Sequence, residues 1–391
     1  MSALEAFKAQ FDTRHCHLNN AGLSPISRRA RDVVRDWAER FYQEGYFADA
    51  AYDLLVANAR ASLATLLKTA PSQIAFFSST AVAVSQVAFG LRLKHGDQVI
   101  TGADEYGSNL YPWREACARS GATIVEIPSG PGGSFTTESI VAAITPETKV
   151  VAVSWVQFQA GALLDLKVLG GICQRQDILL VVDAIQGVGI YDMDFTGWGI
   201  DALCGGSHKW LVSPVGVGYL AISQKLFSQL QPIHVGAQSF GSCDDPTQER
   251  CVLKVDASRF EPGAKASIEI MALGASIDLI LETGVSVIGH EVRRLALRLR
   301  KALTEQGYRV ICPHTKSDAA LEHEGHTGSI VSFSATASSA YKDNRNIYAA
   351  LRANGIHAVL RGQGVRLSPH AFNSDLEIDK AVNILSPKSS L

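Results

Sequence analysis

Short, strand-length apolar runs recur through the first two thirds of the chain, with helical patterns between them. The runs lie at 74–77, 98–100, 123–127, 150–154, 179–182 and 218–222. They are rich in Val and Ile and lack polar alternation, which is typical of parallel strands buried on both faces. Helices are expected over 27–67, with a break near Gly45, and over 83–93. This alternation predicts a largely parallel sheet covered by helices on both faces.

The pattern changes after about residue 258, where long helical segments become dominant. Helices are expected over 268–282, 286–306, 344–354 and 376–385, with one strand over 329–334. We therefore expect a large domain over 17–258 and a smaller α+β domain built from 1–16 and 259–391. The length of 391 residues agrees with two or three domains, at about 150 residues per domain.

Composition and charge exclude several classes of protein. Apolar residues make up 47% of the chain, enough to bury a large core, so a disordered protein is excluded. The net charge of −2 provides no basic surface for nucleic acid. The apolar runs are too short to span a membrane, and the N-terminus lacks the pattern of a signal peptide. Seven scattered cysteines without a C-x-x-C pair or zinc-ligand spacing predict reduced thiols in a cytoplasmic protein.

Two polar positions follow buried runs and carry candidate chemistry. Asp183 comes directly after an apolar run, and the carboxyl edge of a parallel sheet is where ligands bind in open α/β folds. Twenty-six residues later, Lys209 stands in Gly205-Gly206-Ser207-His208-Lys209-Trp210. Small and aromatic neighbours favour a buried amine whose lowered pKa makes it a nucleophile. Taken alone, the aspartate fits a helix cap equally well, and a single lysine is usually solvated.

The combination of these motifs resembles the pyridoxal 5′-phosphate (PLP) enzymes of aminotransferase class V. The resemblance rests on Asp183-x-x-Gln186, Ser207-His208-Lys209-Trp210 and Gly216-Val217-Gly218, and it extends from His17 to Asn373. The family includes cysteine desulfurases, selenocysteine lyases, cystine C–S lyases and isopenicillin N epimerases. The resemblance implies an α/β fold of PLP-dependent fold type I, with a mostly parallel seven-stranded sheet and a smaller C-terminal α+β domain. It also implies a homodimer with shared active sites.

The resemblance implies a role for each residue of the lysine and aspartate motifs. Lys209 would bind PLP covalently and move the α-proton of the substrate. Asp183 would pair with the ring nitrogen and keep it protonated, so that the ring accepts electrons. Gln186 would hydrogen-bond the 3′ oxygen of the ring, and His208 would contact the phosphate with help from Ser207.

Other positions would complete the cofactor site. Ser79, Thr80 and Ala81 lie where an apolar strand runs into a helix, and a helix N-terminus favours an anion such as phosphate. An ordinary N-cap is the alternative explanation for the two hydroxyls. Tyr106 stands where desulfurases carry the histidine that stacks on the ring. Ala264 replaces the family threonine that reaches the phosphate site of the partner subunit.

The resemblance also identifies candidate substrate residues. Arg366 matches the arginine that binds the substrate carboxylate, and Arg361 is a second candidate; either arginine alone could be a surface residue. Phe158 replaces a desulfurase asparagine that touches the substrate, although it could also be a core aromatic. Asn20 belongs to the matching N-terminal motif and is expected in the substrate site.

The segment 356–366 contains no cysteine, whereas desulfurases carry their nucleophilic cysteine there. Cys312 lies before the strand expected at 329–334, and Cys243 and Cys251 lie in the connection before the domain boundary, from which they could approach the pocket. We therefore expect a PLP enzyme that abstracts the α-proton of an amino acid, most simply a β-eliminating carbon–sulfur lyase. A class V aminotransferase or an amino-acid epimerase is the alternative. A PLP-binding protein without turnover and a nucleotide-binding α/β protein are weaker alternatives, the latter because no G-x-G-x-x-G follows the first strand.

Overall fold

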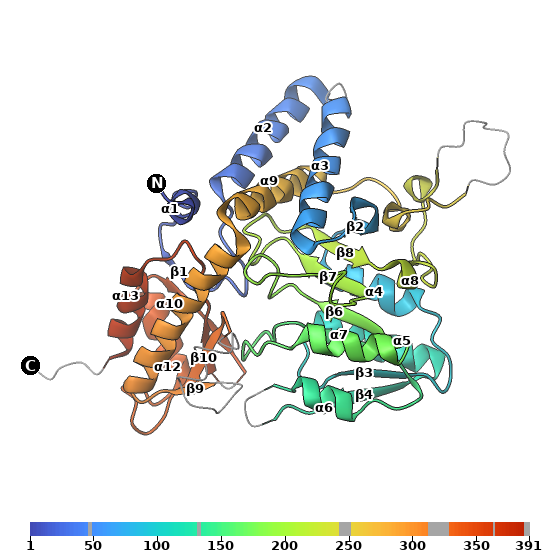
Figure 1. Ribbon diagram of the computed structural model, residues 1–391. Coiled ribbons are helices and arrows are strands. Elements are labelled where there is room, and N and C mark those ends of the chain that lie inside the picture. The colour runs from blue at the N-terminus through green and yellow to red at the C-terminus, as the bar shows by residue number, and fades with distance from the viewer. Residues whose placement is uncertain (46–48, 131–133, 242–251, 312–327, 363, 387–391) are drawn as a thin grey trace, which may run out of the picture.

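The computed structural model describes residues 1–45, 49–130, 134–241, 252–311, 328–362 and 364–386. The chain forms a large sheet flanked by helices and a smaller sheet beside it (Figure 1). A hairpin of α2 (Arg28–Glu44) and α3 (Asp49–Leu67) packs against α9 (Ser267–Thr283).

The large sheet has seven strands in the order β2-β8-β7-β6-β5-β3-β4. Their bounds are β2 Ile74–Phe77, β3 Gln98–Gly102, β4 Thr123–Ile127, β5 Thr148–Ser154, β6 Leu179–Asp183, β7 Ala202–Gly206 and β8 Gly218–Ile222. Strand pairs from β4 to β7 are parallel, and β8 runs antiparallel to both of its neighbours. The expected mostly parallel seven-stranded sheet is thereby confirmed.

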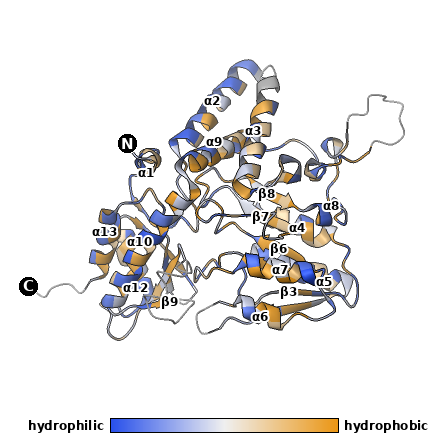
Figure 2. Cartoon of the chain, viewed as in Figure 1, coloured by the Kyte–Doolittle hydropathy of each residue, from blue (hydrophilic) through white to orange (hydrophobic). Residues whose placement is uncertain are grey.

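Alternate residues of these strands enter two separate apolar cores, so both faces of the sheet are buried. On β6, Leu180 and Val182 face a core that also contains residues of α3 and α9, whereas Leu179 and Val181 face a core with residues of α4 and α5. The flanking helices are α4 Thr80–Gly90, α5 Gly107–Ser120, α6 Thr137–Ala142, α7 Leu166–Arg175 and α8 Gln224–Phe227. Figure 2 shows the contrast between the hydrophobic strands and the largely hydrophilic α2.

The smaller sheet is antiparallel and lies at the other end of the molecule. Its strands follow the order β12-β13-β10-β9, with bounds Val359–Arg361, Gly364–Leu367, Val331–Ser334 and Arg309–Ile311. The helices α10 (Val285–Glu305), α12 (Asn344–Ala353) and α13 (Asp375–Leu385) form a third core with it. The short helices are α1 Ala3–Lys8 and the 3-10 turns Pro71–Gln73, Ala237–Ser239 and Ala257–Phe260.

The two ends of the chain meet beside the smaller sheet. Strand β1 (Cys16–His17) pairs in parallel with β11 (Ile356–His357), and Asn19 bridges to Ser368. The amide of Ser368 donates to the carbonyl of Leu18 at 2.7 Å. The N-terminal segment is thereby fixed next to the strand that carries Arg366.

Within the described residues, no single helix is long and apolar enough to cross a membrane; α9 and α10 pass that test only as a pair, bent by 84°.

Candidate active site

A cavity of about 310 Å³ lies at the carboxyl edge of the large sheet, where it meets the smaller sheet. Predicted site residues enter it from the loops that follow β2, β3 and β7 and from Asp183, the last residue of β6. The residues that line it are Asn19, Ala21, Gly22, Ser79, Thr80, Ala81, Tyr106, Ser108, Asp183, Ile185, His208, Lys209, Val359, Arg361 and Arg366. The structure therefore brings together most residues predicted for the cofactor and the substrate.

Lys209 is buried in the wall of this cavity, with 9% of its surface exposed. Burial, together with the nearby Arg366 and Arg361, lowers the pKa of its amine to about 8, although Asp183 opposes this effect. Asp183 is 2% exposed, and burial raises its pKa while a hydrogen bond from the Ile185 amide (3.0 Å) favours the charged form. A lysine with this pKa has a substantial neutral fraction near pH 7 to 8, as a nucleophile or base requires.

The start of α4 offers a site for an anion. Ser79 is the N-cap, and its hydroxyl accepts from the Val82 amide at 3.3 Å. The Thr80 hydroxyl is buried and has no hydrogen-bond partner among the described residues. Gly206 of β7 leaves space beside the Thr80 hydroxyl, because a Cβ on residue 206 would lie 2.9 Å from Thr80 Oγ1. An unpartnered hydroxyl at a helix N-terminus fits a phosphate group.

His208 lies beside this anion site and lines the cavity. Burial and the neighbouring Lys209 lower its pKa to about 4, so the ring is neutral near pH 7. A neutral imidazole can donate one hydrogen bond to a phosphate without contributing a positive charge.

Tyr106, Arg361 and Arg366 also line the cavity, and Phe158, which is outside the lining, contacts all three. The Tyr106 and Phe158 rings meet edge to face at 5.3 Å. The Lys209 amine lies 5.7 Å from the Tyr106 ring centre. Arg366 is 2% exposed, and its Nη1 donates to the Phe158 carbonyl at 2.6 Å while its Nη2 donates to Asn19 Oδ1 at 3.4 Å.

Glu105 is a second buried carboxyl near Asp183, and the sequence did not single it out. Its side chain accepts from the backbone amide of Ser154 at 2.6 Å and from the Ser154 hydroxyl. Ser154 ends β5 and is opposite Asp183 in the sheet. Burial raises the pKa of Glu105 to about 7, and the charge of Asp183 adds to the effect. The loop that presents Tyr106 is thereby anchored to the sheet edge.

Five predicted residues lie outside the cavity lining: Phe158, described above, and four others. The Gln186 amide donates to the Ala21 carbonyl at 3.0 Å and accepts from the Trp210 indole at 2.9 Å, which leaves one amide hydrogen available. The Ser207 hydroxyl donates to the Pro214 carbonyl instead of a ligand. Asn20 is fully buried and donates to the Ser368 carbonyl at 2.9 Å, whereas its neighbour Asn19 lines the cavity. Ala264 is exposed and does not line the cavity of its own chain.

The structure adds six lining residues to the predicted set: Asn19, Ala21, Gly22, Ser108, Ile185 and Val359. Asn19 shares a motif with Asn20, and only the structure decides which of the two side chains turns toward Arg366. The sequence did not identify Val359 as a site residue, because its side chain is apolar and has no group that binds or reacts. Its place follows from the β12–β13 pairing, in which it is opposite Arg366.

None of the described cysteines lines this cavity. Cys16, Cys117, Cys173 and Cys204 are free and buried elsewhere, and burial raises the pKa of each thiol. Buried thiols with raised pKa values are poor nucleophiles. Cys243, Cys251 and Cys312 lie outside the described residues.

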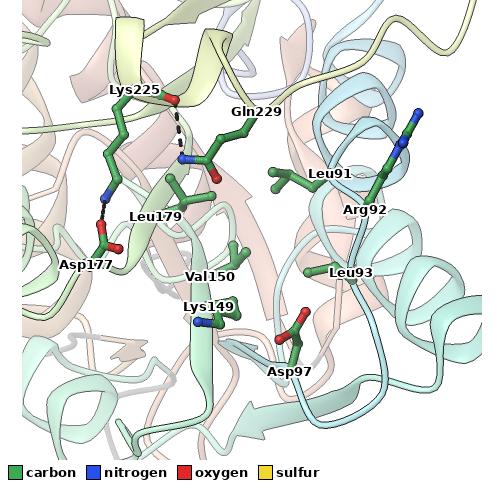
Figure 3. Close-up of a pocket in the computed structure, with 10 residues that line it drawn as sticks. All are labelled: Leu91, Arg92, Leu93, Asp97, Lys149, Val150, Asp177, Leu179, Lys225 and Gln229. Carbon is green, nitrogen blue, oxygen red and sulfur yellow. Dashed lines mark hydrogen bonds and ion pairs between the residues drawn. The ribbon is translucent and has the colours of Figure 1, made fainter.

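Another cavity, of about 320 Å³, opens at the opposite edge of the large sheet, where β5 and β6 begin (Figure 3). Its polar residues include Asp97, Lys149, Asp177 and Lys225, and the last two form an ion pair at 2.8 Å. The carboxyl edges of the parallel strands, where ligands bind in such sheets, are far from this cavity. The cavity around Lys209 is therefore the better candidate for catalysis.

Comparison with known proteins agrees with this assignment. The aminotransferase class-V family matches residues 24–368. A protein of Methanothermobacter thermautotrophicus named "Probable cysteine desulfurase" is 29% identical over 280 residues, 69% of this chain and 68% of that protein. Isopenicillin N epimerase of Amycolatopsis lactamdurans is 25% identical over 98% of this chain and 97% of its own.

Solved structures show the same fold. The cystine C–S lyase C-DES, in complex with cysteine persulfide, superimposes with a TM-score of 0.84 at 20% identity, over 95% of this chain and 97% of its own. The fold and the lysine–aspartate site define a PLP-dependent enzyme of fold type I. The chain belongs to the aminotransferase class-V family, and its cofactor is PLP.

The residues present fit this cofactor. The unpartnered Thr80 hydroxyl and the free amides of α4 suit its phosphate, and the buried Lys209 suits covalent attachment. Asp183 would hold the proton on the ring nitrogen. Tyr106, 40% exposed, offers a ring face at the mouth of the cavity.

Proposed function

We propose that this enzyme is a carbon–sulfur lyase that uses no cysteine nucleophile. It abstracts the α-proton of an amino acid and then eliminates a substituent that is bonded to the β-carbon through sulfur. The observation that carries the proposal is the buried Lys209, whose pKa is lowered to about 8 within the cavity that Asp183 and Arg366 also line. When bound, PLP supplies the sink for the electrons that proton removal leaves on the α-carbon.

The residues of the chain supply the remaining steps. Arg366 binds the α-carboxylate and orients the substrate, because a guanidinium matches a carboxylate with two parallel hydrogen bonds. The neutral Lys209 amine accepts the α-proton, and the β-substituent leaves with its bonding electron pair. The segment 356–366 provides no thiol to accept the sulfur, so the departing group is released rather than transferred to the protein.

The alternative is epimerisation or transamination at the same α-carbon. The full-length similarity to isopenicillin N epimerase supports epimerisation in particular. All three reactions begin with the same proton transfer, so the products distinguish them.

We also propose a homodimer with shared active sites. The loop around Ala264 is exposed and does not contact the cavity of its own chain, which agrees with a role at a partner subunit. Replacement of the family threonine by Ala264 leaves only backbone groups to reach the partner.

A panel of amino acids and disulfide-containing amino acids tests the proposed function. The holoenzyme should release pyruvate, ammonia and a sulfur product from one class of substrate, and Lys209→Ala should abolish release while Lys167→Ala, on the surface, should not. Borohydride reduction should attach the cofactor to Lys209. Inverted substrate without product release would establish the epimerase, and keto-acid exchange would establish the aminotransferase.

A further inference from the structure

The hairpin of β12 and β13 places two guanidinium groups on one face. Val359 is opposite Arg366, and Arg361 is opposite Gly364. Side chains two residues apart on a strand share a face, so Val359 and Arg361 point to the same side, and the cross-strand pairing adds Arg366 to it. All three residues line the cavity at Lys209.

The two arginines are held differently. The Arg366 guanidinium donates to Phe158 and Asn19, and it is almost fully buried. The Arg361 guanidinium lies 5.3 Å from the Tyr106 ring centre and 5.1 Å from that of Phe158, and it has no hydrogen bond or ion pair with any other described residue. Contact with aromatic faces leaves the N–H edge of a guanidinium available for an anion.

The cavity lining has more positive charges than Asp183 and one substrate α-carboxylate can balance. Lys209, Arg361 and Arg366 line it, whereas Asp183 is the single carboxylate in the lining made by described residues. Burial is the main cause of the lowered pKa values of Lys209 and Arg366, and the positive charge of Arg361 lowers both further. Asp183 is assigned to the ring nitrogen, and the anion site at α4 is formed by other residues. One α-carboxylate at Arg366 leaves Arg361 without a counter-charge.

We propose that Arg361 binds a second anionic group of the substrate, so that the preferred substrate is an amino acid with a negatively charged side chain. The Tyr106 and Phe158 rings hold the guanidinium in place, and Phe158 contacts both arginines through its ring and its carbonyl. The inference rests on the proposed function only in that the cavity binds an amino acid through Arg366.

Binding measurements test this proposal without turnover. Calorimetry on the holoenzyme compares succinate, which carries two carboxylates, with succinamate, in which one of them is a neutral amide. The wild-type enzyme should bind succinate at least tenfold more tightly, and Arg361→Gln should reduce this ratio to about one. The visible absorption band of the bound cofactor gives a second measurement. Glutamate should perturb this band at lower concentration than glutamine in the wild-type enzyme, and Arg361→Gln should remove the difference.

Two controls keep the outcome clear. Arg352→Gln removes an exposed guanidinium from α12 and should leave the ratio unchanged. Cofactor content and melting temperature should show that Arg361→Gln is folded and loaded. A wild-type enzyme without preference for the diacid, or an Arg361→Gln enzyme that keeps the preference, would overturn the proposal. Failure of every amino acid to perturb the band would instead contradict the proposed function.

Discussion

At the scale of single residues, burial sets the chemistry of the site. Lys209, Asp183 and Glu105 are each less than a tenth exposed, and desolvation is the largest influence on the pKa of each. It lowers the pKa of the amine and raises those of the carboxyls, because low-dielectric surroundings disfavour charge. The sequence identified Lys209 and Asp183 through their motifs. It could not identify Glu105, whose hydrogen-bond partner Ser154 is 49 residues away in the sequence.

Glu105 should make stability depend on pH. Its folded pKa of about 7 lies above the ordinary value of 4.5, so the folded state retains a proton that the unfolded state loses between these values. Stability of the wild-type protein should therefore fall, relative to Glu105→Gln, as the pH rises from about 4.5 to 7. Melting temperatures of both proteins from pH 4.5 to 8 measure this difference, and a constant difference across that range would contradict the assignment.

At the scale of elements, apolar runs located most strands of the large sheet. The expected strands at 74–77, 123–127 and 218–222 have the bounds of β2, β4 and β8. The sequence did not reveal β7, because Ala202-Leu-Cys-Gly-Gly206 lacks β-branched residues. The structure supplies the reason: a Cβ at Gly205 would lie 2.3 Å from the Tyr219 hydroxyl, and one at Gly206 would approach Thr80. The β12–β13 hairpin was also missed, since its strands have only three and four residues.

Gly206 should matter for phosphate recognition. Gly206→Ala places a methyl group against Thr80 Oγ1, so the affinity for PLP should fall about tenfold or more, whereas the affinity for pyridoxal, which lacks the phosphate, should change little. Equilibrium titrations followed by absorbance measure both affinities. Gly171→Ala on α7 is the matched control, because its nearest neighbour is the flexible end of Arg175 at 3.5 Å. Equal losses for both ligands would place the phosphate elsewhere.

At the scale of the whole molecule, a buried ion pair joins segments far apart in sequence. Glu261 pairs with Arg60 of α3 at 2.8 Å, accepts from the Phe76 amide of β2 at 2.8 Å and contacts Lys265 at 3.1 Å. Its side chain is 2% exposed. The connection between the large sheet and α9 is therefore fastened to the edge of that sheet.

Loss of this carboxylate should destabilise the fold. Glu261→Gln leaves the Arg60 charge without its partner, which should cost about 3 kcal/mol of unfolding free energy. The exposed pair of Arg29 and Glu282 gives a matched control, and Glu282→Gln should cost less than about 1 kcal/mol. Denaturant titrations compare the two variants. Equal small losses would mean that Glu261 does not fasten the connection.

The meeting of the two chain ends has a consequence for biosynthesis. The cavity uses residues from Asn19 to Arg366, and the segment at 16–20 is held by β11 and Ser368. A growing chain on the ribosome therefore has no complete substrate site until Arg366 has emerged, although its cofactor residues from Ser79 to Lys209 are made earlier. Because a ligand stabilises only the state that binds it, a substrate held by Arg366 can contribute to stability only after the segments at 16–20 and 356–368 have come together.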